Sequence, residues 1–133
     1  TKRILKRKRI LMKALKQEDL KELTKQVYDL LNTTKVEIGH NTDGKTLASL
    51  SKIFAADLIQ EKRFGNMTFN QVQDAFRLGV RFADFEPFLN IRTFYRWVYA
   101  HKKVVDNATN QVEVQHMKPS EVPYYQEPLK LLK

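Results

Sequence analysis

Four residues in the second half of the chain recur at a spacing that suits contact with phosphate groups. They are Arg92, Arg96, Tyr99 and Lys103. A helix with about 3.6 residues per turn places all four in one narrow stripe. Arginine and lysine neutralise nucleic-acid phosphates, and no Asp or Glu occurs between Pro87 and Val105 to compete for them. The stripe therefore predicts a helix that lies on a phosphate backbone.

The opposite side of the same helix is expected to be buried. It carries Phe94, Trp97, Val98, His101 and Val105. His101 lies at the centre of this apolar side, which favours a core histidine over a metal ligand. The other histidines, His40 and His116, are far from it in the sequence, and no nucleophile, paired-carboxylate or zinc motif occurs. We therefore predict a protein that is not an enzyme and has no cofactor and no metal.

A second basic group lies in the N-terminal arm, residues 1–16. The arm has eight lysines and arginines and no acid, whereas the rest of the chain has 16 basic and 15 acidic residues, so the arm holds nearly all of the net charge of +9. Like charges at this density favour a polyanionic partner. The arm residues predicted to contact nucleic acid are Lys2, Arg3, Lys6, Arg7, Lys8 and Arg9.

The conformation of the arm is open to three interpretations. Residues 3–16 can form an amphipathic helix, although Lys8 interrupts its apolar side. The apolar side comprises Ile4, Leu5, Leu11, Met12 and Leu15. Such a helix would dock on the domain, order on nucleic acid, or lie on a membrane surface. The membrane interpretation is the weakest, because no aromatic residue anchors the apolar side.

Residues 39–46 match the phosphate-loop pattern G-x-x-x-x-G-K-[ST]. A true phosphate loop follows a buried apolar strand, whereas residues 35–38 alternate charged and apolar side chains like a short exposed strand. Residues 53–57 are an apolar run that ends in Asp57, like a strand that ends at a magnesium-binding aspartate, but they lie within the pattern of the next helix. We therefore expect a loop in which Thr42 or Asp43 caps the next helix, and we regard the phosphate-loop match as coincidental.

Hydrophobic periodicity predicts the helices that position the stripe. One begins after Gln17, one spans about Gly44–Lys62 and ends at a left-handed Gly65 or Asn66, and one begins at a Thr68–Gln71 capping box and closes at Gly79. A further helix begins near Asn90. The expected core positions before it are Leu20, Leu23, Val27, Leu30, Leu31, Leu47, Leu50, Ile53, Phe54, Leu58, Phe69, Val72, Phe76 and Val80.

Two segments resemble parts of helix-turn-helix DNA-binding domains. Residues 75–81 resemble the first helix and turn of that family, with a small residue four positions before a turn glycine, and residues 93–97 resemble its recognition helix. The resemblance is local, covering about 30 of the 133 residues. It departs from the family at residues 81–92, which lengthen the turn. The resemblance implies DNA binding through the helix that carries Arg96.

The C-terminal part has a different pattern. Residues 104–105 and 111–114 are predicted to pair as a hairpin around residues 106–110, like the wing of a winged-helix domain. Residues 117–133 contain three prolines, so we expect an extended tail that either straps the domain or engages a protein partner.

The sequence as a whole predicts a mainly α-helical single domain of about five helices, with a short hairpin and an extended tail. The predicted parts of the chain are a basic N-terminal arm at residues 1–16, a helical core at residues 17–105, and a hairpin with an extended tail at residues 106–133. The predicted function is a small basic nucleic-acid-binding protein, with DNA favoured over RNA; the alternative is a helical interaction protein of a larger assembly such as a virion or ribonucleoprotein. The chain has no cysteine and no apolar run of membrane-spanning length, which predicts a cytoplasmic, nucleoid or virus-particle location without a membrane partner.

Overall fold

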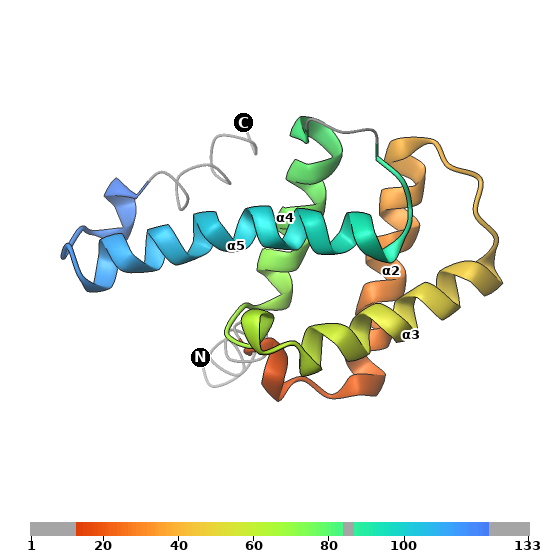
Figure 1. Cartoon of the computed structure of the whole chain (residues 1–133), viewed down its shortest axis with the longest axis horizontal. Helices are drawn as coiled ribbons and strands as arrows, with labels where there is room; N and C mark the ends of the chain where they lie inside the picture. Colours follow the sequence, from red (N-terminus) through yellow and green to blue (C-terminus); the bar gives the residue numbers. More distant parts are fainter. Residues whose placement is uncertain (1–12, 84–86, 123–133) are drawn as a thin grey trace, which may run out of the picture.

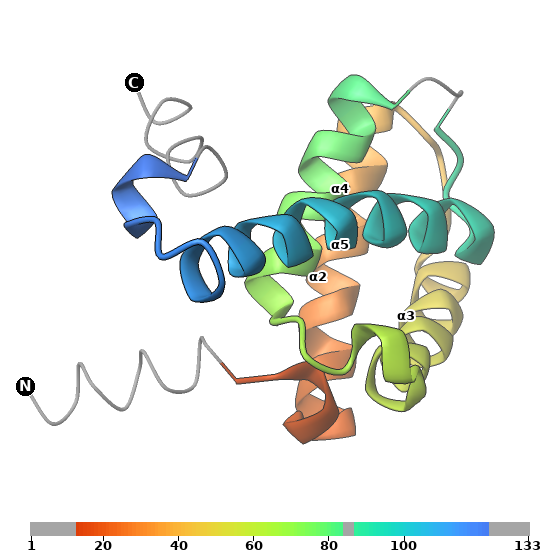
Figure 2. The same ribbon diagram turned by 60° about the vertical axis from the view of Figure 1, so that its left-hand side comes forward.

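The computed structural model describes residues 13–83 and 87–122, and its secondary structure there is helical apart from an isolated β-bridge between Ala14 and Thr68. Helix α2 packs against α3, α4 packs against α5, and contacts between α2 and α4 join the two pairs. Helix α5 crosses α4, and its C-terminal part projects beyond the other helices (Figure 1 and Figure 2). The elements are η1 Leu15–Gln17, α2 Leu20–Ile38, α3 Gly44–Gln60, η2 Lys62–Phe64, α4 Phe69–Phe82, α5 Ile91–Glu113 and η3 Pro119–Glu121.

The mainly α-helical prediction is confirmed, but the described residues contain four α-helices where the sequence predicted about five. The additional helix was expected over residues 3–16, and most of that segment lies outside the described residues. Its last residues are not α-helical, because Ala14 has extended backbone angles and η1 is a short 3-10 turn. Residues 123–133 of the predicted tail also lie outside the described part of the chain.

Each α-helix begins at a residue whose side-chain oxygen accepts a hydrogen bond from the first turn. Asn90, for example, accepts from the backbone N–H of Thr93 at 2.9 Å, and Thr68 forms the predicted capping box with Gln71. A cap of this kind stabilises a helix by about 1 kcal/mol. The predicted helix starts are therefore confirmed; the cap residues are Asp19, Asp43, Thr68 and Asn90.

The strand predicted at residues 35–38 is wrong, because this segment is the last turn of α2. Leu31 and Thr34 are buried and Ile38 is half-buried, so the helical spacing continues to the end of the segment. Gly39 then ends the helix with φ 73°, in the left-handed region that glycine favours.

The hairpin predicted around residues 106–110 is also wrong, because α5 continues through this segment to Glu113. His101, Val105 and Ala108 are all buried and are spaced four and three residues apart, which is the period of a helix and not of a strand. Val104, Val105 and Val112, which suggested strands, therefore belong to one helix, and Val114 is its C-cap.

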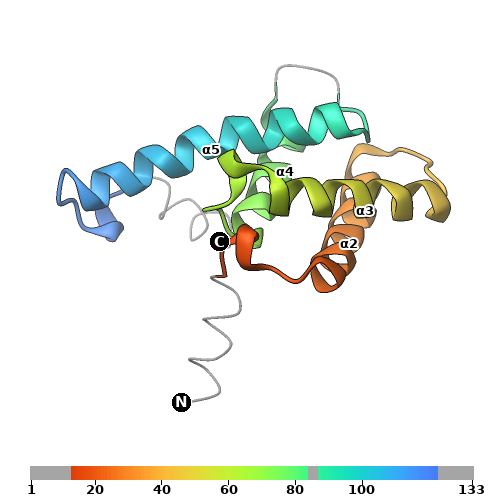
Figure 3. The same ribbon diagram turned by 60° about the horizontal axis from the view of Figure 1, so that its bottom comes forward.

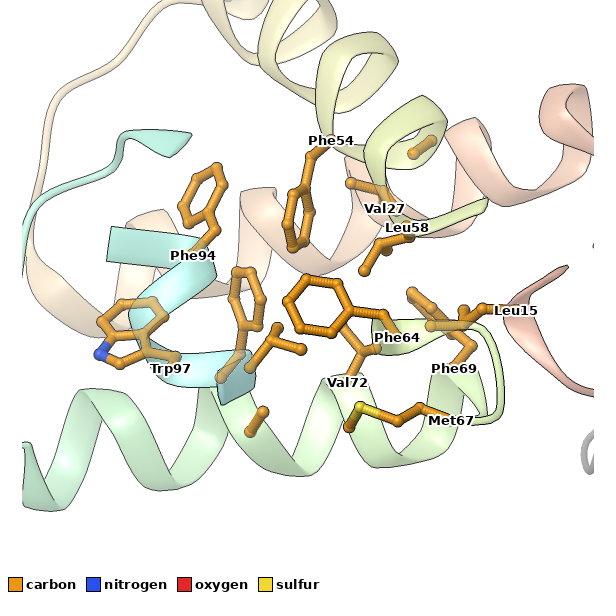
Figure 4. Close-up of a cluster of buried hydrophobic side chains, with 14 of the residues drawn as sticks. Leu15, Val27, Phe54, Leu58, Phe64, Met67, Phe69, Val72, Phe94 and Trp97 are labelled. Atoms are coloured by element: carbon orange, nitrogen blue, oxygen red, sulfur yellow. The ribbon is translucent and has the colours of Figure 1, made fainter. Parts of the chain in front are cut away.

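Aromatic rings from α3, α4 and α5 form the centre of the core. The ring of Phe54 lies 5.2 Å from that of Phe94, and Phe76 lies 5.2 Å from both Phe94 and Trp97, measured between ring centroids. All four side chains are at most 2% exposed. Figure 4 shows rings of this cluster next to aliphatic side chains that include Leu15, Val27, Leu58 and Val72. Tilted and edge-on ring pairs at these distances fix the angle between helices as well as burying apolar area.

Several predicted packing details differ in the structure. Leu20 and Ile53, expected in the core, are 49% and 51% exposed. Ile53 points away from the core because the buried side of α3 is formed by Leu47, Ser51, Phe54, Ala55 and Leu58, whose helical spacing leaves Ile53 on another side. Gly65 has φ −58°, so it is not a left-handed cap; the chain continues from α3 into η2 instead. Leu15, assigned to the arm by sequence, is fully buried.

Candidate nucleic-acid interface

The basic stripe of α5 lies on the exposed side of the helix. Arg92, Arg96 and Lys103 are exposed, whereas Tyr99 is half-buried. Figure 3 shows α5 along one edge of the helical core, so that one side of the helix faces away from α3 and α4. The opposite side is buried as predicted, at Phe94, Trp97, Val98, His101 and Val105. The burial of one side therefore fixes the orientation of the other.

Tyr99 packs on the core and holds a further arginine beside the stripe. Its ring lies 5.0 Å from that of Phe64, and the guanidinium carbon of Arg63 lies 4.8 Å from the centre of the Tyr99 ring. Arg63 also donates to Glu61 at 2.9 Å, which raises the pKa of Arg63 and lowers that of Glu61. Arg63 thus joins the exposed surface beside α5. The sequence analysis missed it, because nothing local signals contact between residues 36 positions apart.

Tyr95 borders the same surface and stays uncharged. Burial raises the pKa of its phenol to about 12, and a hydrogen bond to Asp57 acts in the same direction. The neutral phenol therefore adds no negative charge beside the basic residues, and its hydroxyl group donates a hydrogen bond to the carboxylate of Asp57.

Several other basic residues on the described surface are paired with carboxylates. Arg81 of α4 contacts Glu37 of α2 at 2.6 Å, and Lys102 pairs with Asp106 one turn away. Within the described ranges, neither Arg92 nor Lys103 forms such an ion pair. As far as the described residues are concerned, a phosphate group would therefore meet these two charges without first displacing a carboxylate.

The N-terminal arm joins the domain close to this surface. The backbone N–H of Leu15 donates to the carbonyl of Met67 at 2.8 Å, and that of Lys16 donates to Gly65 at 3.2 Å. Gly65 is two residues from Arg63, which lies over the ring of Tyr99. The arm is therefore attached to the domain within a few residues of a side chain that contacts the stripe. The predicted contact residues of the arm itself lie outside the described residues: Lys2, Arg3, Lys6, Arg7, Lys8 and Arg9.

The phosphate-loop match has a different context from a nucleotide site. Helix α2 runs directly into Gly39, where a phosphate loop would follow a strand. Asp43 caps α3 by accepting from the N–H of Thr46 at 3.2 Å, and hydrogen bonds from the side chain and the backbone of Thr46 lower the pKa of Asp43. Lys35 donates to the carbonyl of Thr42 at 3.1 Å, and Lys45 is exposed. The loop is thus organised by contacts with the two helices that flank it.

The segments that resemble a helix-turn-helix domain lie on α4 and α5, but Gly79 is not a turn residue. Helix α4 continues past it to Phe82, so the prediction that Gly79 closes this helix is wrong. Gly79 instead allows close approach of Trp97, as the distances show: a Cβ at residue 79 would lie 2.3 Å from two atoms of the indole. Residues 83–90 separate the helices, in agreement with a lengthened connection.

Comparisons of the chain with protein-family models, with curated proteins and with solved structures find no match. In the parts of the chain with described coordinates, no group of three or more His, Asp or Glu residues is arranged to hold a metal ion. Nor does any helix there combine the length and apolar character needed to cross a bilayer.

Proposed function

We propose that this protein binds nucleic acid, with DNA as the favoured form, and catalyses no reaction. The observation that carries the proposal is the alignment of Arg92, Arg96 and Lys103 on the exposed side of α5, opposite a fully buried side. A helix rises about 1.5 Å per residue, so this set spans about 17 Å. That length corresponds to roughly five base-pair steps of a duplex.

The arm supplies the second part of the proposed interface. It carries most of the net positive charge of the chain, and it joins the domain beside Gly65, close to Arg63. A charged segment attached next to a basic helix can contact a second stretch of the same polyanion. Recognition would then combine a fixed helix with a flanking arm, and phosphate contacts would dominate the affinity.

The proposal is tested by the salt dependence of binding to a labelled generic duplex. Each lost phosphate contact lowers the slope of log K against log salt concentration by about 0.9. We expect the Arg92→Ala/Arg96→Ala/Lys103→Ala variant to lose up to three such contacts. The matched control is Lys21→Ala/Lys45→Ala/Lys52→Ala, which removes the same charge from exposed positions on α2 and α3. An equal loss of slope in both variants would contradict a specific role for α5.

A second candidate function is that of a helical interaction protein in a larger assembly, such as a virion or ribonucleoprotein. The observation that favours it is an apolar groove between α4 and α5, bordered by the exposed side chains of Phe82 and Val104. Absence of duplex binding even at low salt would make this the better function. The groove does not depend on nucleic-acid binding, so both functions can also coexist.

A further inference from the structure

The apolar groove between α4 and α5 is separate from the face that carries Arg92 and Lys103. It has a volume of about 400 Å³. The side chains that shape it are Leu78, Phe82, Ala83, Trp97, Ala100 and Val104. Phe82 is 71% exposed and Val104 is 44% exposed, so two large apolar side chains border one recess. Apolar surface gathered in this way is typical of a binding site.

Trp97, one of the residues that line the groove, has a hydrogen-bond donor that lacks a partner within the described residues. Trp97 is 2% exposed, and its indole nitrogen Nε1 is buried without a hydrogen-bond partner. Figure 4 shows this nitrogen directed away from the centre of the aromatic cluster. An unpaired buried N–H group is costly, commonly by about 1–3 kcal/mol.

The charges around the groove favour an acidic occupant. Its ionisable lining residues are Arg96 and His101, and no Asp or Glu belongs to the described lining. Arg96 belongs to the basic stripe and also lines the groove, where a carboxylate of a bound segment would meet its guanidinium group. A duplex presents phosphates but no matching row of aliphatic side chains, so the apolar lining is better suited to protein.

We infer that this groove binds an amphipathic helix from a partner protein. The apolar side of that helix contacts Phe82 and Val104, and an acidic residue at its border pairs with Arg96. A recess between two packed helices accepts a third helix through apolar anchors at positions i, i+3, i+4 and i+7. The apolar contacts at Phe82 and Val104 are distinct from the proposed duplex contacts at Arg92 and Lys103, whereas Arg96 borders both surfaces.

The experiment selects ligands from a displayed library of random peptides of about 15 residues, which is about four helical turns. Selected peptides are then titrated against the full chain, with the fluorescence of Trp97, the single tryptophan, as the signal. We expect them to share helically spaced apolar residues and at least one Asp or Glu. The variant Phe82→Gln/Val104→Gln should bind them at least about tenfold more weakly.

The matched control is Phe88→Gln/Ile53→Gln, which replaces an exposed phenylalanine and an exposed β-branched residue away from the groove, at 50% and 51% exposure. It should bind the peptides as the wild type does. The inference is overturned if no peptide is enriched, if the selected peptides are basic, or if both double variants bind equally. It is also overturned if the groove variant loses duplex binding, or loses a dimer detected by sedimentation, because nucleic acid or a second copy would then be the occupant.

Discussion

Gly79 of α4 and Trp97 of α5 meet at a distance that leaves no space for a side chain at residue 79. A Cβ atom there would lie 2.3 Å from both Cγ and Cδ1 of the indole and 2.6 Å from Cδ2. The absence of a side chain thus lets the indole rest directly against the backbone of α4. This contact sets the separation of the two helices that carry the groove and the basic stripe.

The variant Gly79→Ala should therefore be destabilised, by about 1–3 kcal/mol, because the rigid indole or the helix must move. The free energy of unfolding in urea measures this directly. Gly44→Ala is the control, since the nearest atom to a Cβ there is the Tyr28 hydroxyl oxygen at an ordinary 3.7 Å. It should change stability by less than about 1 kcal/mol. Equal stability of the two variants would show that the helices are not held by this contact.

The features that sequence predicts well are those fixed by neighbouring residues. The capping box of Thr68 and Gln71 needs residues only three positions apart, and the buried side of α5 follows from one helical period. The same local reasoning gave the strand at residues 35–38 and the hairpin at 106–110, because short apolar alternations fit both periods. In the structure the preceding helices, α2 and α5, extend through these segments, so both segments are helical.

The features that sequence missed depend on contacts between distant residues. Arg63 reaches the basic stripe only because η2 packs beside Tyr99, and Leu15 enters the core because its backbone pairs with Met67. Neither pair has a spacing that can be read along the chain. The position of Gly79 opposite Trp97 is of the same kind, which is why a glycine that suggested a turn proves to be a packing residue.

Leu15 provides a test of where the arm ends and the domain begins. It is fully buried and hydrogen-bonded to the segment between η2 and α4, so Leu15→Ala should lower the free energy of unfolding by about 2–5 kcal/mol. Leu20→Ala removes the same atoms at a position that is 49% exposed, and it should cost less than about 1 kcal/mol. Both are measured by urea denaturation. If the Leu15 variant is as stable as the Leu20 variant, Leu15 does not contribute to the core and belongs to the arm.

Tyr95 should make the stability fall at alkaline pH. Its pKa is raised from 10.0 to about 12 in the folded protein, chiefly by burial, so the folded state holds the phenolic proton more tightly than the unfolded state. This contribution is complete below pH 10 and is lost as the pH rises from 10 through 12. The stability difference between wild type and Tyr95→Phe, measured at pH 9 and pH 11, should therefore shrink at the higher pH. A difference that does not change with pH would contradict the raised pKa.

The arm and the folded domain should contribute separately to nucleic-acid binding. Deleting residues 1–12 removes six of the basic residues but leaves Leu15 in place. If these residues contact phosphates, the deletion lowers the salt slope by up to about five units, at about 0.9 per contact. A full-length control in which the same six residues are glutamine should lose the same slope, because the charge and not the length of the arm is responsible. Urea denaturation should give both variants the stability of the wild type. An unchanged slope would place the phosphate contacts on the domain alone, and a loss of stability in the deletion but not in the glutamine variant would show that apolar residues of the arm pack on the core.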